Sequence, residues 1–217
     1  MINEKHITVS AIVLAAGLGS RFGGDKLLTP ISLNDSDQAL PLGIVSALNI
    51  EPHVDNVICV VRPEDSMLKQ QLAFHNIKTI DNSDYKQGLS SSIIAGVRAC
   101  NDGSHYIICL ADMPYILSSS YDTIIETFKA DLDMHLNKDK DINPTSGIFR
   151  PVLLLNKPIE QKISGHPVLF NKKYRQALLQ ITGDKGAQSL IKEYGFSPIF
   201  LQDEGVIADI DRPEDIR

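Results

Sequence analysis

Four glycines, one arginine and one lysine lie within ten residues, from Gly17 to Lys26, directly after an apolar run. Glycines let successive backbone N–H groups turn toward one point, and the side chains of Arg21 and Lys26 add two cations facing it. Such a loop is suited to binding several phosphate oxygens. Two cations match the charge of a nucleoside triphosphate better than that of a bridging pyrophosphate, so the segment predicts a triphosphate site.

The two commonest phosphate-binding motifs do not fit this loop. A P-loop requires Ser or Thr after its Gly-Lys pair, but Lys26 follows Asp25 and precedes Leu27. A dinucleotide fingerprint requires a third glycine where Phe22 stands. A relaxed fingerprint that ends at Gly23 stays open as an alternative, and with it a nicotinamide-dependent oxidoreductase.

A carboxylate follows another apolar run. Asp112 comes directly after residues 106–110 and is followed by Met113 and Pro114. Mg²⁺ in proteins is bound by one or two carboxylates together with substrate phosphates, so Asp112 is a candidate metal ligand. The alternative is a turn or helix N-cap, although Ser118 is available to cap the next helix.

A second acidic cluster, over residues 208–215, contains Asp209 and Asp211 at strand-like spacing. Pro213 with the acidic residues after it is typical of a helix start, and this context favours helix capping for Asp211. A phosphate loop that works with Mg²⁺ also needs a second carboxylate, which makes Asp209 and Asp211 candidate metal ligands.

Residues 87–92 (Gln-Gly-Leu-Ser-Ser-Ser) offer an amide, a flexible backbone and three hydroxyl groups for the polar edges of a base or ribose. Ser90 is alternatively a helix N-cap. His166, between Gly165 and Pro167, is a candidate contact for a second substrate, the alternative being a packed or surface histidine.

These residues require a scaffold that brings loop ends together. Apolar, β-branched runs at 8–14, 57–61, 78–80 and 106–110 alternate with helical patterns at 42–48, 67–72 and 93–99. This alternation predicts βαβ units in a three-layer α/β/α sandwich with a mainly parallel, Rossmann-like sheet. Ligands of such sheets lie beyond the carboxyl ends of the strands, where the glycine-rich loop and Asp112 would both be.

The second half departs from the alternation. Residues 131–143 are polar and predict a surface excursion, and residues 147–155 and 164–170 predict an antiparallel addition that covers the open end of the pocket. Helical patterns return at 172–181 and 187–194, and 198–201 predicts a late strand. We therefore expect a single domain over 1–217, in which 131–170 forms a surface excursion and a hairpin.

The composition limits the functional class. A net charge of −6 argues against broad nucleic-acid binding, and no apolar run approaches the ~20 residues of a membrane helix. Residues 1–6 are polar and unlike a signal peptide, which makes a cytoplasmic protein the expectation. Cys59, Cys100 and Cys109 lack metal-like spacing and are expected to be small buried residues.

Taken together, the motifs resemble the MobA-like nucleotidyltransferase family, and within it the molybdenum cofactor cytidylyltransferases. The resemblance covers essentially the whole chain. It implies that 1–217 is one nucleotidyltransferase domain, with 131–170 near the acceptor site. The sequence departs from the family pattern at Arg212, where threonine is usual, and in longer segments around 138–141 and 150–165. The matching blocks are residues 14–21 with Gly23 and Lys26, then 88–92, 110–114, 165–168, 183–187 and 209–215.

The resemblance implies transfer of CMP from CTP to the terminal phosphate of molybdopterin or the molybdenum cofactor, with Mg²⁺ as cofactor and release of pyrophosphate. Lys26, Arg21 and Asp112 would be catalytic, and the metal ligands would be Asp112 with Asp209 or Asp211. Ala16 stands where guanosine-using relatives tend to have glycine, which favours cytosine over a purine. Ser91, Ser92 and His166 would contact the acceptor. The nucleotide-binding residues would be Leu14, Ala15, Ala16, Gly17, Gly19, Ser20, Arg21, Lys26, Gln87, Gly88 and Ser90.

A molybdoenzyme or its chaperone would receive the product, and no nucleic acid or membrane is expected as a partner. Two alternatives stay open beside the oxidoreductase. The acceptor of the nucleotide could be a sugar phosphate or polyol phosphate, or the chain could be a non-catalytic chaperone that binds the cofactor.

Overall fold

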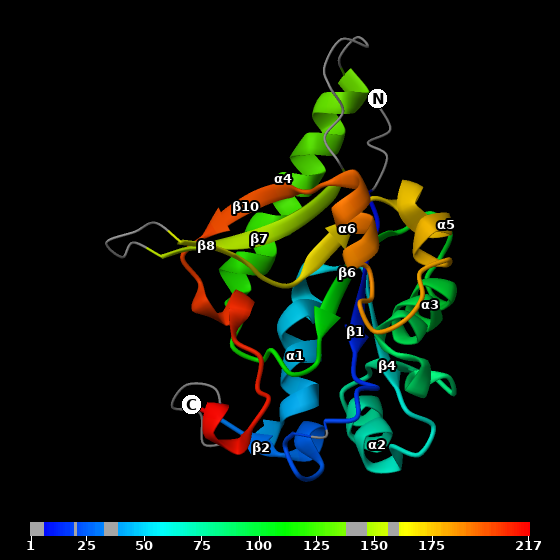
Figure 1. Cartoon of the computed structure of the whole chain (residues 1–217), viewed down its shortest axis with the longest axis vertical. Coiled ribbons are helices and arrows are strands. Elements are labelled where there is room, and N and C mark those ends of the chain that lie inside the picture. Colours follow the sequence, from blue (N-terminus) through cyan, green and yellow to red (C-terminus); the bar gives the residue numbers. More distant parts are fainter. Residues whose placement is uncertain (1–6, 20, 33–38, 138–146, 156–160) are drawn as a thin grey trace.

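A mixed sheet of eight strands forms the centre of the molecule (Figure 1). The structure, a computed structural model, describes residues 7–19, 21–32, 39–137, 147–155 and 161–217. The strand order is β10-β7-β9-β6-β1-β4-β5, with β8 paired to β7. The strands are β1 (Val9–Leu14), β4 (Asn56–Val61), β5 (Lys78–Asp81), β6 (His105–Leu110), β7 (Ile148–Leu155), β8 (Gln161–Ser164), β9 (Val168–Phe170) and β10 (Ser197–Leu201).

The strand order changes direction at β1. On one side of β1 lie β4 and then β5, and both run parallel to β1. On the other side lies β6, which is also parallel to β1. A crevice between connections that leave in opposite directions is the usual ligand site of open α/β sheets. The glycine-rich loop follows β1 and Asp112 follows β6, so both predicted phosphate and metal groups lie at this point.

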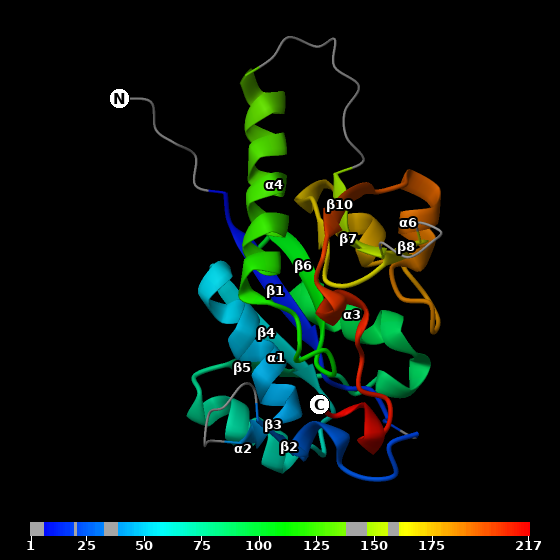
Figure 2. The same ribbon diagram turned by 90° about the vertical axis from the view of Figure 1, so that its left-hand side faces the viewer.

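Helices cover both faces of the sheet, which confirms the predicted three layers (Figure 2). Val9, Ala11 and Val13 of β1 pack in one core with the first set of helices, and Ile12 and Leu14 in another with the second set. Both sides of β1 are buried, which explains its continuous apolar run. The first set is α1 (Leu42–Ile50), α2 (Ser66–Phe74) and α4 (Ser118–Asn137), and the second is α3 (Leu89–Ala99), α5 (Arg175–Leu178) and α6 (Gln188–Tyr194).

The surface excursion predicted for residues 131–143 is wrong in its first part, because α4 continues to Asn137. Asp131 is buried on this helix, and Figures 1 and 2 show the far end of α4 extending past the sheet. Charged residues on the exposed side of a long amphipathic helix make its sequence resemble a polar loop. Residues 138–146 lie outside the described part of the chain.

The antiparallel addition is confirmed, but it extends the main sheet. Strand β7 pairs antiparallel with both β8 and β9, and β9 pairs antiparallel with β6. No described residue of 147–170 lines the cavity beside the glycine-rich loop, and a role of this segment in covering the open end of the substrate pocket stays a prediction. The turn at Asn156 to Pro158 lies outside the described residues.

Short elements complete the fold. The strands β2 (Pro30–Ile31) and β3 (Leu40–Pro41) form a small antiparallel sheet. All three cysteines are free and buried, as expected, and burial raises the pKa of Cys100 to about 11. None of the described helices has the length and hydropathy needed to span a membrane. The 3-10 helices are η1 (Lys26–Leu28), η2 (Glu51–His53), η3 (Tyr85–Gln87), η4 (Lys172–Tyr174), η5 (Glu204–Ile207) and η6 (Pro213–Asp215).

Candidate active site

The loop between β1 and η1 has the backbone geometry that its glycines predict. Gly19 and Gly23 have φ of +56° and +78°, in the left-handed region that favours glycine. The N–H of Lys26 donates to the carbonyl of Gly24 at 2.9 Å, so a tight turn returns the chain to the sheet edge. Ser20, predicted to bind nucleotide, lies outside the described residues.

Lys26 is the buried cation of this site. Its side chain is only 8% exposed, and its Nζ donates to Asp112 Oδ2 at 2.7 Å. Burial raises the pKa of the Asp112 carboxyl, which the hydrogen bond and charge of Lys26 partly oppose, while the charge of Asp209 raises it further. A buried charge is stable only when it is paired, so the ammonium and the carboxylate hold each other at the end of β6.

Arg21 and Asp211 form the outer half of the same network. Arg21 Nη1 lies 2.6 Å from Asp211 Oδ2, and Asp211 Oδ1 lies 3.7 Å from Lys26 Nζ. The backbone N–H of Ile210 donates to the carbonyl of Asp112 at 2.9 Å and thereby fixes the C-terminal segment against the end of β6. Two cations and two carboxylates from three distant segments thus meet at the switch point of the sheet.

Helix capping, which its sequence context favoured for Asp211, is wrong. The helix η6 does begin at Pro213, but its N-cap is Arg212, and Asp215 accepts the backbone N–H groups of Asp211 and Arg212. The side chain of Asp211 faces Arg21 and Lys26. Asp112 does lie in a turn after β6, as one alternative held, and its side chain pairs with Lys26. The next helix, α4, begins only at Ser118, so the N-cap alternative is wrong.

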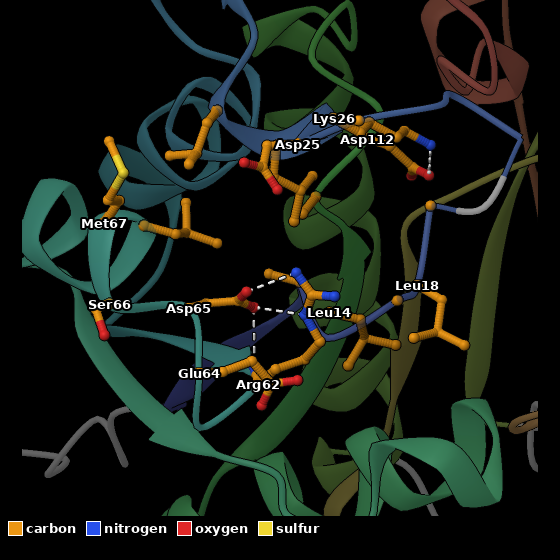
Figure 3. A pocket seen from close by; sticks show the side chains of 18 residues that line it. Leu14, Leu18, Asp25, Lys26, Arg62, Glu64, Asp65, Ser66, Met67 and Asp112 are labelled. Carbon is orange, nitrogen blue, oxygen red and sulfur yellow. Dashed lines mark hydrogen bonds and ion pairs between the residues drawn. The ribbon is translucent and has the colours of Figure 1, made fainter.

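A cavity of about 410 Å³ lies beside the loop. Figure 3 shows Lys26 and Asp112 on one side of it and Arg62, Glu64 and Asp65 on the opposite side. This volume is within the range of small-ligand sites. Of the residues predicted to bind nucleotide or metal, those lining the cavity are Leu14, Ala15, Gly17, Gly19, Lys26 and Asp112.

The block at 87–92 lines a different cavity, of about 650 Å³, through Gln87, Ser90 and Ser91. The predicted nucleotide contacts therefore fall into two groups. Gly88 has φ +97°, and a side chain there would clash with Asp184. It precedes α3, whose N-cap it is, so the alternative of Ser90 as N-cap is wrong.

The three serines are engaged within the protein. Ser90 Oγ donates to the carbonyl of Gly183 at 2.6 Å, and Ser91 Oγ donates to the carbonyl of Gly88 at 2.8 Å. The amide nitrogen of Asn82 donates to the hydroxyl oxygens of Ser91 and Ser92. These bonds hold the start of α3 near the 183–187 loop; acceptor contacts of Ser91 and Ser92 stay a prediction.

His166 lies near the carboxyl end of β6. It is two residues from Val168, which pairs with Ile108, and its ring forms a hydrogen bond with the Ile108 backbone. Burial lowers its pKa to about 4, with help from the charge of Arg150, so the ring is neutral at pH 7. Its Nδ1 is buried and has no hydrogen-bond partner in the described part of the chain. The cavity of about 410 Å³ is not lined by His166, nor by four other predicted residues, Ala16, Arg21, Asp209 and Asp211.

Sequence reasoning missed the wall formed by Arg62, Glu64 and Asp65. These residues follow β4 directly, and β4 was predicted as a strand. The rule that ligands lie beyond the carboxyl ends of parallel strands identified the loops after β1 and β6. The same rule applied to β4 would have identified this wall.

Comparisons with known proteins identify the family of this chain. A family model described as the MobA-like NTP transferase domain matches residues 11–198. The chain is 27% identical over 214 residues to the molybdenum cofactor cytidylyltransferase of Escherichia coli (strain K12), covering 95% of this chain and 93% of that protein. It is 22% identical, with the same coverage, to the nicotine blue oxidoreductase of Paenarthrobacter nicotinovorans.

Solved structures share the fold. The crystal structure of Rv0371c from Mycobacterium tuberculosis H37Rv superposes with a TM-score of 0.72 at 20% identity, covering 96% of this chain and 95% of that chain. A manganese complex of the same protein has a TM-score of 0.69 at 18% identity, with the same coverage. Because the family model matches well over half of its residues, the chain belongs to the MobA-like NTP transferase family and is a nucleotidyltransferase.

Proposed function

We propose that this nucleotidyltransferase transfers CMP from CTP to the terminal phosphate of molybdopterin or the molybdenum cofactor. The observation that carries the proposal is the buried Lys26, held between Asp112 and Asp211 at the end of the glycine-rich loop. The similarity to a molybdenum cofactor cytidylyltransferase over 95% of the chain supports the choice of substrates.

In the proposed reaction, an oxygen of the acceptor phosphate forms a bond to the α-phosphorus of CTP. The bond between this phosphorus and the bridging oxygen breaks, and pyrophosphate leaves with the electron pair. The acceptor is already an anion and needs no strong base, so the barrier arises from bringing two anions together and from charge on the leaving group. Lys26 and Arg21 would exchange their carboxylate partners for phosphate oxygens and stabilise that charge.

The carboxylates fit a divalent cation. Asp112 and Asp211 both lie beside Lys26 Nζ, and hard oxygen ligands of this kind suit Mg²⁺. The described residues hold no group of three or more His, Cys, Asp or Glu side chains placed for a metal, so phosphate oxygens and water would complete the shell. A bound Mg²⁺ would neutralise phosphate charge near the reacting phosphorus. The contact with Lys26 favours Asp211 over the more exposed Asp209 as the second ligand.

Pyrophosphate release measured with each of the four ribonucleoside triphosphates, with and without molybdopterin, tests the proposal. We expect release that requires CTP, Mg²⁺ and the pterin. Preference for GTP would contradict the choice of base. CTP-dependent release with a sugar or polyol phosphate in place of the pterin would contradict the acceptor, and cofactor binding without pyrophosphate release would identify a chaperone. We also propose that the protein acts in the cytoplasm and that a molybdoenzyme or its chaperone receives the product.

A further inference from the structure

Arg62, in the cavity wall opposite Lys26, is held in one orientation by Asp65. Its Nε donates to Asp65 Oδ2 at 2.9 Å and its Nη2 donates to Asp65 Oδ1 at 2.6 Å. The backbone N–H of Arg62 donates to Asp65 Oδ2 as well, at 3.2 Å. The two side chains are only 25% and 11% exposed, so this paired fork is a fixed part of the wall.

The other edge of the guanidinium group has no hydrogen-bond partner among the described residues. Arginine carries five N–H donors, of which Asp65 takes one from Nε and one from Nη2. Nη1 makes no hydrogen bond within the part of the chain that the structure describes. Figure 3 shows this nitrogen turned into the cavity on the side of Leu14. Nη1 and the second hydrogen of Nη2 thus present two parallel donors to whatever fills the cavity.

Which part of a bound nucleotide contacts the free edge of Arg62 depends on where the phosphate groups are bound. Lys26 and Asp112 line one side of the cavity and Arg62 the other. A nucleotide whose phosphates are bound at Lys26 and whose nucleoside occupies the cavity directs its base toward Arg62. Two parallel donors pair with two adjacent acceptors on one base edge.

We propose that Arg62, positioned by Asp65, is a base-selecting residue that binds the O2 and N3 acceptors of cytosine. Uracil carries a hydrogen on N3, which faces an arginine donor unfavourably. Adenine has no pair of adjacent acceptors, whereas guanine presents one at O6 and N7. The inference rests on the proposed function and deepens it, because it assigns the selection of the base to a residue that is not part of the phosphate site.

The test compares binding of CTP, UTP, GTP and ATP to the full-length wild type and to Arg62→Ala, Arg62→Lys and Asp65→Asn, by equilibrium dialysis with Mg²⁺. We expect Arg62→Ala to reduce the preference for CTP over UTP about ten- to a hundredfold, the discrimination typical of a bidentate arginine–base pair. Arg62→Lys keeps the charge but loses the fork, so it should lose the same preference. Asp65→Asn should lose part of it, because the guanidinium group is no longer held.

Lys192→Ala is the control, since Lys192 is an exposed cation on α6 and lines neither the 410 Å³ nor the 650 Å³ cavity. It should keep the wild-type preference. Circular dichroism verifies folding, and Arg62→Lys provides the test if Arg62→Ala does not fold.

Equal weakening of all four nucleotides in the Arg62 variants, or an unchanged ratio of CTP to UTP, would overturn this inference and leave the proposed function intact. A wild-type preference for GTP would overturn the assignment to cytosine. Absence of binding by all four nucleotides to the wild type would overturn the proposed function itself.

Discussion

Lys26 carries more of the proposed chemistry than any other single residue. Its ammonium group lies 2.7 Å from Asp112 and 3.7 Å from Asp211, and its side chain is 8% exposed. Water screens such a buried charge weakly, so its attraction for a phosphate oxygen is strong. The side chain of Arg21 is 74% exposed, so water screens its attraction for a phosphate oxygen more strongly.

We predict that Lys26→Ala lowers kcat for pyrophosphate release at least about a hundredfold, the usual cost of losing one fixed donor to a developing negative charge. The measurement is kcat at saturating nucleotide, with circular dichroism to verify folding. Lys192→Ala, which removes an exposed lysine of α6, is the control and should keep wild-type kcat. A folded Lys26→Ala variant with near-wild-type kcat would contradict the proposed role.

At the scale of elements, the site depends on how closely α3 packs on the sheet. Gly96 of α3 faces Ile12 of β1, and a Cβ on this glycine would overlap with Ile12 Cγ2 and lie 3.2 Å from Val60 Cγ2. The missing side chain lets the helix lie directly on the strand that leads into the phosphate loop. The same helix begins with the residues predicted to contact nucleotide and acceptor.

Gly96→Ala is expected to lower the free energy of unfolding by about 1–3 kcal/mol, the range for overpacking a core, although alanine favours helix. Urea denaturation followed by circular dichroism gives this value. The control is Gly103→Ala, where an added Cβ meets no atom within 4 Å, and a change within about 0.5 kcal/mol is expected. Equal stability of the two variants would contradict the packing argument.

At the scale of the whole molecule, the site combines the glycine-rich loop near the start of the sequence with the segment around Asp211 near its end. The segment after β10 returns to the switch point, where Ile210 is 1% exposed and packs with Ile31, Leu42 and Val45. Ile210 also donates its N–H to the carbonyl of Asp112. Ile210 lies between Asp209 and Asp211 in the sequence, so its burial fixes the backbone position from which both carboxylates extend.

We expect Ile210→Ala to destabilise the fold by about 2–5 kcal/mol, the range for truncating a buried isoleucine. It should also raise the Mg²⁺ concentration needed for half-maximal turnover, because Asp211 is no longer held beside Asp112. Urea denaturation and a Mg²⁺ titration of pyrophosphate release measure the two effects. Ile163→Ala, at a side chain 37% exposed, should change neither. An unchanged Mg²⁺ requirement in folded Ile210→Ala would contradict the proposed metal site.

The sequence alone determined the fold class and the local chemistry. Strands β1, β4, β5, β6 and β10 lie within one residue of the predicted runs. In β1, β4 and β6 the reason is burial of both faces, which produces continuous apolar stretches. The turns of the phosphate loop follow from its glycines, whose backbone preference is a local property. Helix α4 was predicted less well, because polar residues stand among the apolar positions of its last two turns.

Only the tertiary structure decided which distant residues meet. Lys26 and Asp112 are 86 positions apart, and Arg21 and Asp211 are 190 apart, so their pairing depends on strand order and on the return of the chain end. The tertiary structure also divides the predicted nucleotide-binding residues between two cavities and places Arg62 opposite Lys26. The physical reason is that residue type and spacing set local backbone conformation, whereas the packing of helices on the sheet sets distances between loops.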